Sequence, residues 1–411
     1  MAMKKKTLKI ILIGHVDHGK STLIGRLLLD TNSLPREKIS EIRKISRELG
    51  KETELAFLTD QLKEERERSI TIDTTQTFFK TRKRNCVIID APGHVEFIKN
   101  MITGASLAEA ALLLIDINEG IREQTRRHAY VIRFLGIESV IVLFNKVDLV
   151  DYKEERFREV KSELLKLLEA LGIKPSFLIP VSAKKGVNII QRSKKTSWYN
   201  GPPLLKTLDL LKVKPETANR PLRFPIQDVY DLSGEKVIVG KIVSGTIKKG
   251  QDVISFPALR EAKVKSIKVF GKSGKVEGRA GENIGLVLDK APFAERGEVI
   301  TRKGDRLKPS DRFKGKIFWM FEEPLQINES LILRCATQEV KCVVEKIEKR
   351  INSSTLKVME EDAGELKTNE VGEVILRTEK PIAIEKFSFI EELGRFVVER
   401  GYNPRGAGII T

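Results

Sequence analysis

The chain has 411 residues, of which 41% are hydrophobic and 32% are charged, and its formal net charge is +17. This hydrophobic fraction excludes a disordered chain, and no apolar run approaches the roughly 20 residues that a membrane span requires. Three cysteines are too few for a secreted disulfide framework, so we expect a cytoplasmic protein with no membrane contact. The excess of positive charge is compatible with three kinds of binding partner: RNA, an anionic nucleotide or an acidic protein.

The first half of the chain alternates apolar runs with helical patterns. Nearly continuous apolar runs, typical of parallel strands covered on both faces, occur at residues 8–13, 86–90, 111–115 and 140–144. Helical patterns follow at residues 20–29, 123–135 and 154–171. This alternation predicts a doubly wound, mostly parallel α/β domain over residues 1–212, with its ligand at the carboxyl ends of the strands.

The character of the sequence changes after residue 212. A polar linker bounded by prolines occupies residues 214–221, and short β-branched runs such as residues 237–243 then alternate with glycine turns. A second break falls near residues 307–310. We therefore expect two all-β barrel domains, over residues 213–306 and 307–411.

The strongest motif is a phosphate-binding loop at residues 14–21, GHVDHGKS, which matches G-x-x-x-x-G-K-[ST] between a predicted strand and a predicted helix. Such a loop turns its backbone N–H groups toward phosphate oxygens, at the positive end of the helix. Lys20 would reach the β- and γ-phosphates, and the Ser21 hydroxyl would bind Mg²⁺. The residues expected around the phosphates are His15, Val16, Asp17, His18, Gly19, Lys20, Ser21 and Thr22.

Two later segments predict which base is bound. Asp148 in the N-K-x-D segment can accept hydrogen bonds from the N1–H and the 2-amino group of guanine, a donor pair that adenine lacks. A second segment follows the predicted strand at residues 177–180 and suits a backbone contact to the guanine oxygen. The residues expected around the base are Asn145, Lys146, Asp148, Ser182, Ala183 and Lys184.

The segment D-A-P-G-H at residues 90–94 completes the predicted GTP site. Asp90 can hold Mg²⁺ through water, and the Gly93 N–H can sense the γ-phosphate. His94 would orient the attacking water. Upstream, Thr71 offers a second hydroxyl ligand to Mg²⁺, so we expect GTP and Mg²⁺ as cofactors. Lys20, Thr71 and His94 are the expected catalytic residues.

Together these segments resemble the translation-factor-like superfamily of P-loop GTPases over the whole chain. The resemblance implies a G domain followed by two β-barrels, and an apolar gate of Val16 and Ile70 that His94 crosses on activation. Ser69 departs from the pattern, because ribosomal factors usually carry glycine there. The sequence shows no identifiable arginine finger, so we expect slow intrinsic hydrolysis that a partner stimulates.

Two branches of the superfamily compete for this chain. Segments that look like the GTPase (large) subunit of ATP sulfurylase lie at residues 25–31, 33–35, 57–62, 71–74, 119–128, 197–205 and 319–320. On these we expect a subunit of sulfate adenylyltransferase, which couples GTP hydrolysis to adenosine 5′-phosphosulfate synthesis on a small adenylyltransferase subunit. The alternative is an elongation factor of the 1-alpha or Tu type that delivers aminoacyl-tRNA to the ribosome, which residues 14–19 and 393–398 resemble.

Three weaker features are interpreted structurally. Residues 271–275 lack the leading glycine of a second phosphate loop, because Ser266 stands in its place. Cys335 and Cys342 have no histidine nearby and are expected to be buried apolar residues, not metal ligands. Isoleucines and a leucine at helical spacing predict an amphipathic helix over residues 39–49.

Overall fold

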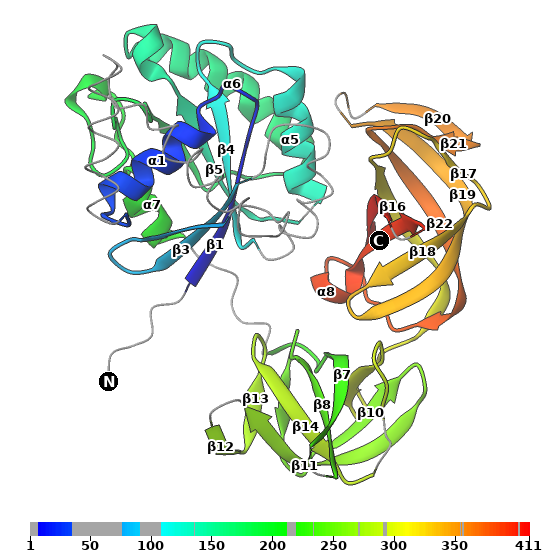
Figure 1. The fold of residues 1–411 in the computed structure, drawn as a ribbon. Coiled ribbons are helices and arrows are strands. Elements are labelled where there is room, and N and C mark those ends of the chain that lie inside the picture. The colour runs from blue at the N-terminus through cyan, green and yellow to red at the C-terminus, as the bar shows by residue number, and fades with distance from the viewer. Residues whose placement is uncertain are drawn as a thin grey trace. The chain divides into compact units, whose positions relative to one another are not determined.

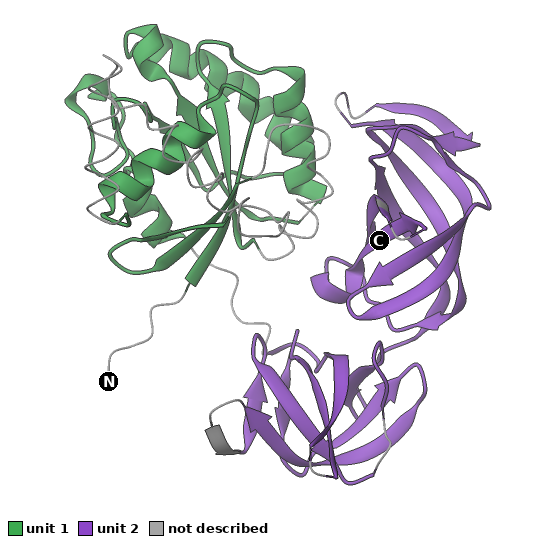
Figure 2. Ribbon diagram, viewed as in Figure 1, with its two compact units in different colours: residues 1–213 green, residues 214–411 purple. Residues whose placement is uncertain are grey.

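The structure is a computed structural model that describes residues 7–34, 76–90, 108–134, 136–211, 219–232, 234–269, 272–290, 294–353, 355, 357–401 and 403–411. The chain divides into two compact units, residues 1–213 and 214–411 (Figure 2). The domain limits expected from the sequence (1–212, 213–306 and 307–411) stay a proposal. The amphipathic helix expected at residues 39–49 lies outside the described residues.

The first unit is built on a 6-stranded sheet in the order β2-β3-β1-β4-β5-β6 (Figure 1). Its strands are β1 (Thr7–Gly14), β2 (Gln76–Lys80), β3 (Asn85–Asp90), β4 (Ala110–Asp116), β5 (Ser139–Asn145) and β6 (Phe177–Pro180). All neighbours pair in parallel except β2, which pairs antiparallel with β3. The strand order changes direction at β1, so the carboxyl end of β1 is a topological switch point, where ligands of such sheets bind.

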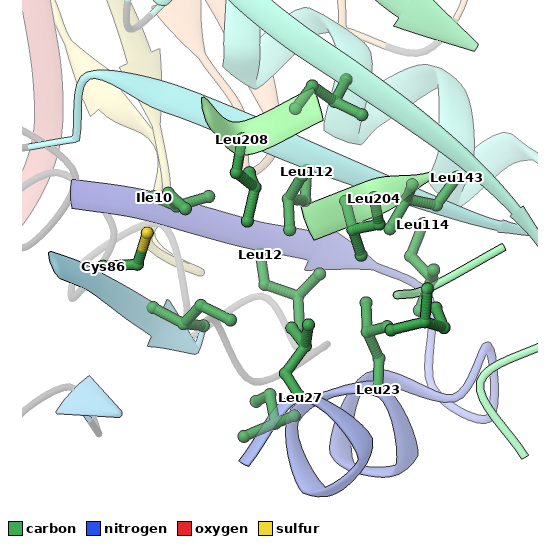
Figure 3. Packing of buried hydrophobic residues seen from close by; sticks show 14 of the residues in the cluster. Ile10, Leu12, Leu23, Leu27, Cys86, Leu112, Leu114, Leu143, Leu204 and Leu208 are labelled. Atoms are coloured by element: carbon green, nitrogen blue, oxygen red, sulfur yellow. The ribbon is translucent and has the colours of Figure 1, made fainter. Parts of the chain in front are cut away.

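Helices cover both faces of this sheet, because β1, β4 and β5 are apolar at successive positions. The helical segments are α1 (Lys20–Asp30), α5 (Glu123–Phe134), α6 (Glu154–Ala170) and α7 (Leu204–Leu210), with short 3₁₀ turns at Val147–Val150 and Lys194–Thr196. On one face, side chains of α1 and α7 converge on Ile10 and Leu12 of β1 (Figure 3). Elsewhere Phe144 of β5 packs edge-to-face on Phe157 of α6. The α/β expectation is confirmed.

The second unit contains two six-stranded β-barrels. Each is a ring of strands that is closed by hydrogen bonding between its two end strands. The first ring runs β10-β15-β7-β8-β14-β11 and closes through β10–β11. The second runs β18-β23-β24-β16-β22-β19 and closes through β18–β19 (Figure 1). Ring closure leaves no free edge in either ring. The expected pair of all-β barrels is confirmed.

The elements of the first barrel are β7 (Phe224–Leu232), β8 (Glu235–Lys241), β9 (Thr246–Lys248), β10 (Asp252–Phe256), β11 (Arg260–Val269), β12 (Lys272–Lys275), β13 (Glu277–Arg279), β14 (Asn283–Leu288) and β15 (Val299–Arg302). Those of the second are β16 (Ser310–Trp319), β17 (Leu325–Gln326), β18 (Ser330–Cys335), β19 (Gln338–Asn352), β20 (Val358–Ala363), β21 (Glu365–Leu366), β22 (Glu370–Ile382), α8 (Glu391–Gly394), β23 (Arg395–Arg400) and β24 (Asn403–Ile410). Cys335 and Cys342 are buried in the second barrel's core, as expected.

A buried arginine joins the two barrels. Arg223 is completely buried, and its Nη2 lies 2.6 Å from Oε1 of Glu385, which follows β22. The same Nη2 donates to the Arg306 carbonyl, in the segment between β15 and β16, over 3.0 Å. An apolar cluster also draws on both barrels, with members that include Val243, Phe256, Val299, Leu307, Ala383, Ile390 and Leu393. No helix within the described ranges is long and apolar enough to cross a membrane.

Candidate nucleotide-binding site

The phosphate loop connects β1 to α1, at the carboxyl end of the central strand. Gly19 precedes α1 with a φ of 92°, in the left-handed region. A Cβ on Gly19 would lie 2.6 Å from Asn145 Nδ2, and a Cβ on Gly14 would lie 2.8 Å from the Leu114 carbonyl oxygen. The loop is therefore packed tightly against β4 and β5, and both glycines of the motif are required by space.

Lys20 begins α1 and turns its side chain back over the loop. Its Nζ donates to the carbonyl oxygens of Gly14 over 2.6 Å and His15 over 2.9 Å. These bonds hold a positive charge beside the first turn of α1, where helix N–H groups and the helix dipole also favour an anion. The arrangement suits the phosphates of a nucleotide.

Three histidines lie in or beside the phosphate loop. The His18 ring is completely buried, with Nδ1 3.1 Å from the Leu114 carbonyl and Nε2 3.6 Å from Glu119. Burial lowers the pKa of His18, so the ring is neutral at physiological pH. His15 lies edge-to-face on His18, with 5.4 Å between ring centroids. His128 of α5 is half-buried, and its removal from water, with Lys20 nearby, lowers its pKa to about 3. The neutral rings of His18 and His128 therefore add no positive charge to the loop.

Asn145, the last residue of β5, joins two loops. Its Nδ2 donates to the His18 carbonyl over 2.8 Å, and its Oδ1 accepts the Ala183 N–H over 2.9 Å. Both bonds are buried. The phosphate loop and the loop after β6 are thereby held at a fixed separation, which is what recognition of one nucleotide by its two ends requires.

Lys146 and Asp148 lie directly after β5 and take different roles. Lys146 Nζ pairs with Asp116 Oδ2 at 2.7 Å, and the Asp116 carboxylate is almost completely buried. Asp148 Oδ1 is buried and, among the described residues, has no hydrogen-bond partner. An unpaired buried carboxylate oxygen is costly unless a donor reaches it. The guanine N1–H and amino group are donors of the required kind.

Residues 182–187 form a turn closed by the bridge between Ser182 and Val187. Arg26 of α1 binds this turn, because its Nε donates to the Ala183 carbonyl over 3.0 Å. The sequence did not predict this contact, since Arg26 and Ala183 are 157 residues apart. Asp116 and His128 were also missed as parts of the site. Only the polar end of the β4 run pointed to Asp116.

The Mg²⁺ ligands predicted from the sequence are described in part. Ser21 lies in the first turn of α1 and Asp90 ends β3, which is adjacent to β1 with Leu12 opposite Asp90. Hydroxyl and carboxylate oxygens are the ligands that Mg²⁺ prefers, so these two positions fit the ion. Within the described residues there is no cluster of histidine, cysteine and acidic side chains that would hold another kind of metal. Thr71, Gly93 and His94 lie outside the described residues, as does Ile70 of the expected gate.

Comparison with known families gives two matches. Residues 5–216 match the elongation factor Tu GTP binding domain, and residues 312–411 match the GTP-eEF1A C-terminal domain-like family. Similar curated proteins include elongation factor 1-alpha of Thermococcus onnurineus, 39% identical over 424 residues, and of Pyrococcus furiosus, 40% identical over 424 residues. Elongation factor 1-alpha of Archaeoglobus fulgidus is 39% identical over 418 residues. Each of these alignments covers 100% of this chain and 98% of the relative.

Solved structures that resemble the chain include sup35 complexed with GDP and sup35 complexed with GMPPNP. They are 24% and 25% identical, and each match covers 99% of this chain and 94% of that chain, with a TM-score of 0.46.

The expectation of an ATP sulfurylase subunit was wrong, because the full-length relatives are named elongation factor 1-alpha. The small adenylyltransferase subunit expected as a partner is likewise unsupported. Several residues in the segments that suggested this branch belong to the core of the fold. Leu27, Leu204 and Trp319 are completely buried, and Tyr199 is nearly so. These residues pack the fold and do not distinguish its activities. The chain belongs to the translation-factor GTPase family of elongation factors Tu and 1-alpha, a family of GTP-binding P-loop GTPases whose cofactors, GTP and Mg²⁺, are those expected from the motifs.

Proposed function

We propose that this protein is a translation elongation factor of the 1-alpha type, which delivers aminoacyl-tRNA to the ribosome in its GTP-bound form and acts in the cytoplasm. The observation that carries the proposal is the 39–40% identity to proteins named elongation factor 1-alpha over 100% of this chain. The net charge of +17 is consistent with a polyanionic RNA partner.

Within this function, the residues around the phosphate loop bind the nucleotide. Lys20 and the first turn of α1 offset the negative charge of the phosphates, and Asp148 accepts hydrogen bonds from guanine. Ser21, Thr71 and Asp90 would hold Mg²⁺, which neutralises phosphate charge when it is bound. The Ser182–Lys184 segment would supply the backbone contact to the guanine oxygen.

His94 is proposed to orient the water that attacks the γ-phosphate, and Gly93 to contact that phosphate. His94→Ala should then lower ribosome-stimulated GTP hydrolysis while leaving GTP affinity nearly unchanged. Stimulated hydrolysis in the variant equal to that of the wild type would contradict the role of His94.

The delivery function is tested by protection of the aminoacyl ester. Purified protein is mixed with aminoacyl-tRNA and either GTP or GDP, and the rate of spontaneous deacylation is measured. We expect protection with GTP, weak protection with GDP, and no competition from deacylated tRNA. Equal behaviour with the two nucleotides, or no protection with either, would contradict the proposal.

An orthogonal control separates nucleotide binding from tRNA binding. Asp148→Asn should prefer xanthosine triphosphate, so ester protection by this variant should return with that nucleotide and not with GTP. Protection by the variant with GTP alone would show that the nucleotide is recognised in another way.

A further inference from the structure

Arg26 connects the helix behind the phosphate loop to the turn at residues 183–186. Its Nε donates to the Ala183 carbonyl over 3.0 Å, and its Nη2 donates to the Lys184 carbonyl over 2.5 Å. Its Nη1 lies 3.6 Å from Asp30, one turn further along α1. The guanidinium thus donates to two consecutive carbonyls, and it also forms an ion pair with the carboxylate of Asp30.

The direction of these carbonyls fixes the direction of one backbone donor. The Ala183–Lys184 peptide is trans, so the Lys184 N–H points away from the Ala183 carbonyl and from α1. The neighbouring amides are already used, since the Ala183 N–H donates to Asn145 over 2.9 Å and the Lys185 N–H donates to Ser182 Oγ over 3.1 Å. In the part of the chain that the structure describes, the Lys184 N–H donates to no acceptor.

We propose that Arg26 is a positioning residue for guanine recognition, which holds the turn so that the Lys184 N–H faces the 6-oxygen of the base. The inference rests on the proposed binding of GTP and adds to it a specificity determinant outside the known motifs. Because α1 begins at Lys20, the same helix orders both the phosphate end and the base end of the site.

Two features explain why this position suits arginine. A planar guanidinium can bind two adjacent carbonyls at once, whereas a lysine ammonium is a compact donor without that fixed fork. The turn also runs close to the guanidinium, since a Cβ on Gly186, where φ is +70°, would lie 3.7 Å from its carbon. Arg26→Lys should therefore restore the positioning only in part.

The test compares three nucleotides in the full-length protein. GDP presents the 6-oxygen, 6-thioguanosine diphosphate presents a weaker sulfur acceptor there, and inosine diphosphate keeps the oxygen but lacks the 2-amino group that Asp148 would bind. We expect Arg26→Met to lower the affinity for GDP about tenfold and the affinity for 6-thioguanosine diphosphate less than about twofold. The ratio of GDP to inosine diphosphate affinity should stay unchanged.

Arg84→Met is the matched control, because Arg84 also binds a carbonyl, that of Leu211 over 2.5 Å, but lies near the amino end of β3, opposite the site. It should change none of the three affinities. Equal weakening of all three nucleotides in Arg26→Met would indicate a purely structural role and overturn the inference. If that variant does not fold, the GDP to 6-thioguanosine diphosphate ratio of Arg26→Lys decides, and a wild-type ratio in a folded Arg26→Lys overturns it.

The outcomes also distinguish this inference from the proposed function. A wild-type protein that binds no guanine nucleotide would overturn both. A wild-type protein that binds GDP but does not prefer it to 6-thioguanosine diphosphate, or an Arg26→Met variant that keeps the preference, would overturn the positioning role alone.

Discussion

The side chain of Asn145 donates to the main-chain carbonyl of His18 over 2.8 Å, across 127 positions of sequence. Through this bond the end of β5 holds the phosphate loop, and through its Oδ1 the same side chain holds Ala183. One amide therefore links the phosphate loop directly to the base loop. Such pre-organisation lowers the cost of ordering the site when a nucleotide binds.

Asn145→Ala should remove both buried bonds at once. Each buried bond lost costs about 1–3 kcal/mol, because its partner is left unsatisfied. We expect GDP affinity, measured with a fluorescent GDP analogue, to fall at least tenfold, or about 1.4 kcal/mol. Asn188→Ala is the matched control, since Asn188 is also buried and bonds to Pro180, Thr196 and Ser193, and to neither His18 nor Ala183. Equal losses of GDP affinity in the two variants would contradict the proposal that Asn145 orders the site by binding both loops.

Asp148→Asn should change the preferred base from guanine to xanthine. The buried Asp148 Oδ1 would be replaced by an amide, which can donate to the 2-oxygen of xanthine but matches the guanine donors poorly. GDP affinity should fall by at least about 100-fold, and xanthosine diphosphate should become the better ligand in direct titration. Unchanged affinity for GDP would refute the role of Asp148.

Asp116→Asn should weaken nucleotide binding through Lys146. The substitution removes the charge that pairs with Lys146 at 2.7 Å but keeps an oxygen to accept the Asn118 N–H, now 2.9 Å away. We expect GDP affinity to fall about fivefold to tenfold, in line with the loss of one charge-assisted bond. The exposed Asp151 follows the same segment, so Asp151→Asn is the control and should leave the affinity unchanged. A wild-type dissociation constant for Asp116→Asn would exclude this role.

His128 should make folding stability depend on pH below neutrality. Its pKa falls from 6.5 in the unfolded chain to about 3 in the folded one, so between these values only the unfolded state binds the proton. The stabilisation is therefore present above about pH 6.5 and is lost as the pH falls, at up to about 1.4 kcal/mol per pH unit.

Urea unfolding of the wild type and His128→Gln at pH 7 and pH 5 measures this effect. The wild type should lose about 1–2 kcal/mol more than the variant between the two pH values. Carboxylates titrate in both proteins and cancel in the difference. Parallel losses would show that the pKa of His128 is close to its ordinary value.

Arg223→Met should destabilise the second unit strongly. The completely buried guanidinium contacts Glu385 at 2.6 Å, so its removal leaves a carboxylate without its partner at about 3–5 kcal/mol of cost. Adding Glu385→Gln should recover part of the loss, because the unpaired charge is then gone. Thermal unfolding of both variants measures this, and a double variant less stable than Arg223→Met would contradict the buried ion pair.

The local sequence was sufficient for most regular elements of the first unit and for the nucleotide motifs, although β2 (Gln76–Lys80) and α7 (Leu204–Leu210) were not predicted. Helix α6 was expected at residues 154–171 and spans Glu154–Ala170, and the run at residues 140–144 became β5 (Ser139–Asn145). These predictions succeed because the apolar pattern of each segment and its flanking loops act within a few residues. The phosphate loop is equally local, since its glycines, Lys20 and Ser21 are contiguous.

Assignment to a branch of the family failed for a related reason. Leu27, Tyr199 and Trp319 resemble one branch locally, but all three are buried and serve packing that the fold needs. The identity measured over the whole chain includes many more positions than these few, and it favours elongation factor 1-alpha.

The sequence by itself determined the alternation of strands and helices in the first half of the chain, the GTPase motifs and the pair of barrels, because each depends on neighbours along the chain. The tertiary structure alone decided that Arg26 binds the turn after β6 and that Asp116 pairs with Lys146. It also decided that Arg223 of the first barrel pairs with Glu385 of the second. These contacts join residues from 30 to 162 positions apart, the shortest being 146 − 116 = 30. The folded sheet and barrels bring such residues together, and no local sequence pattern specifies which of them will meet.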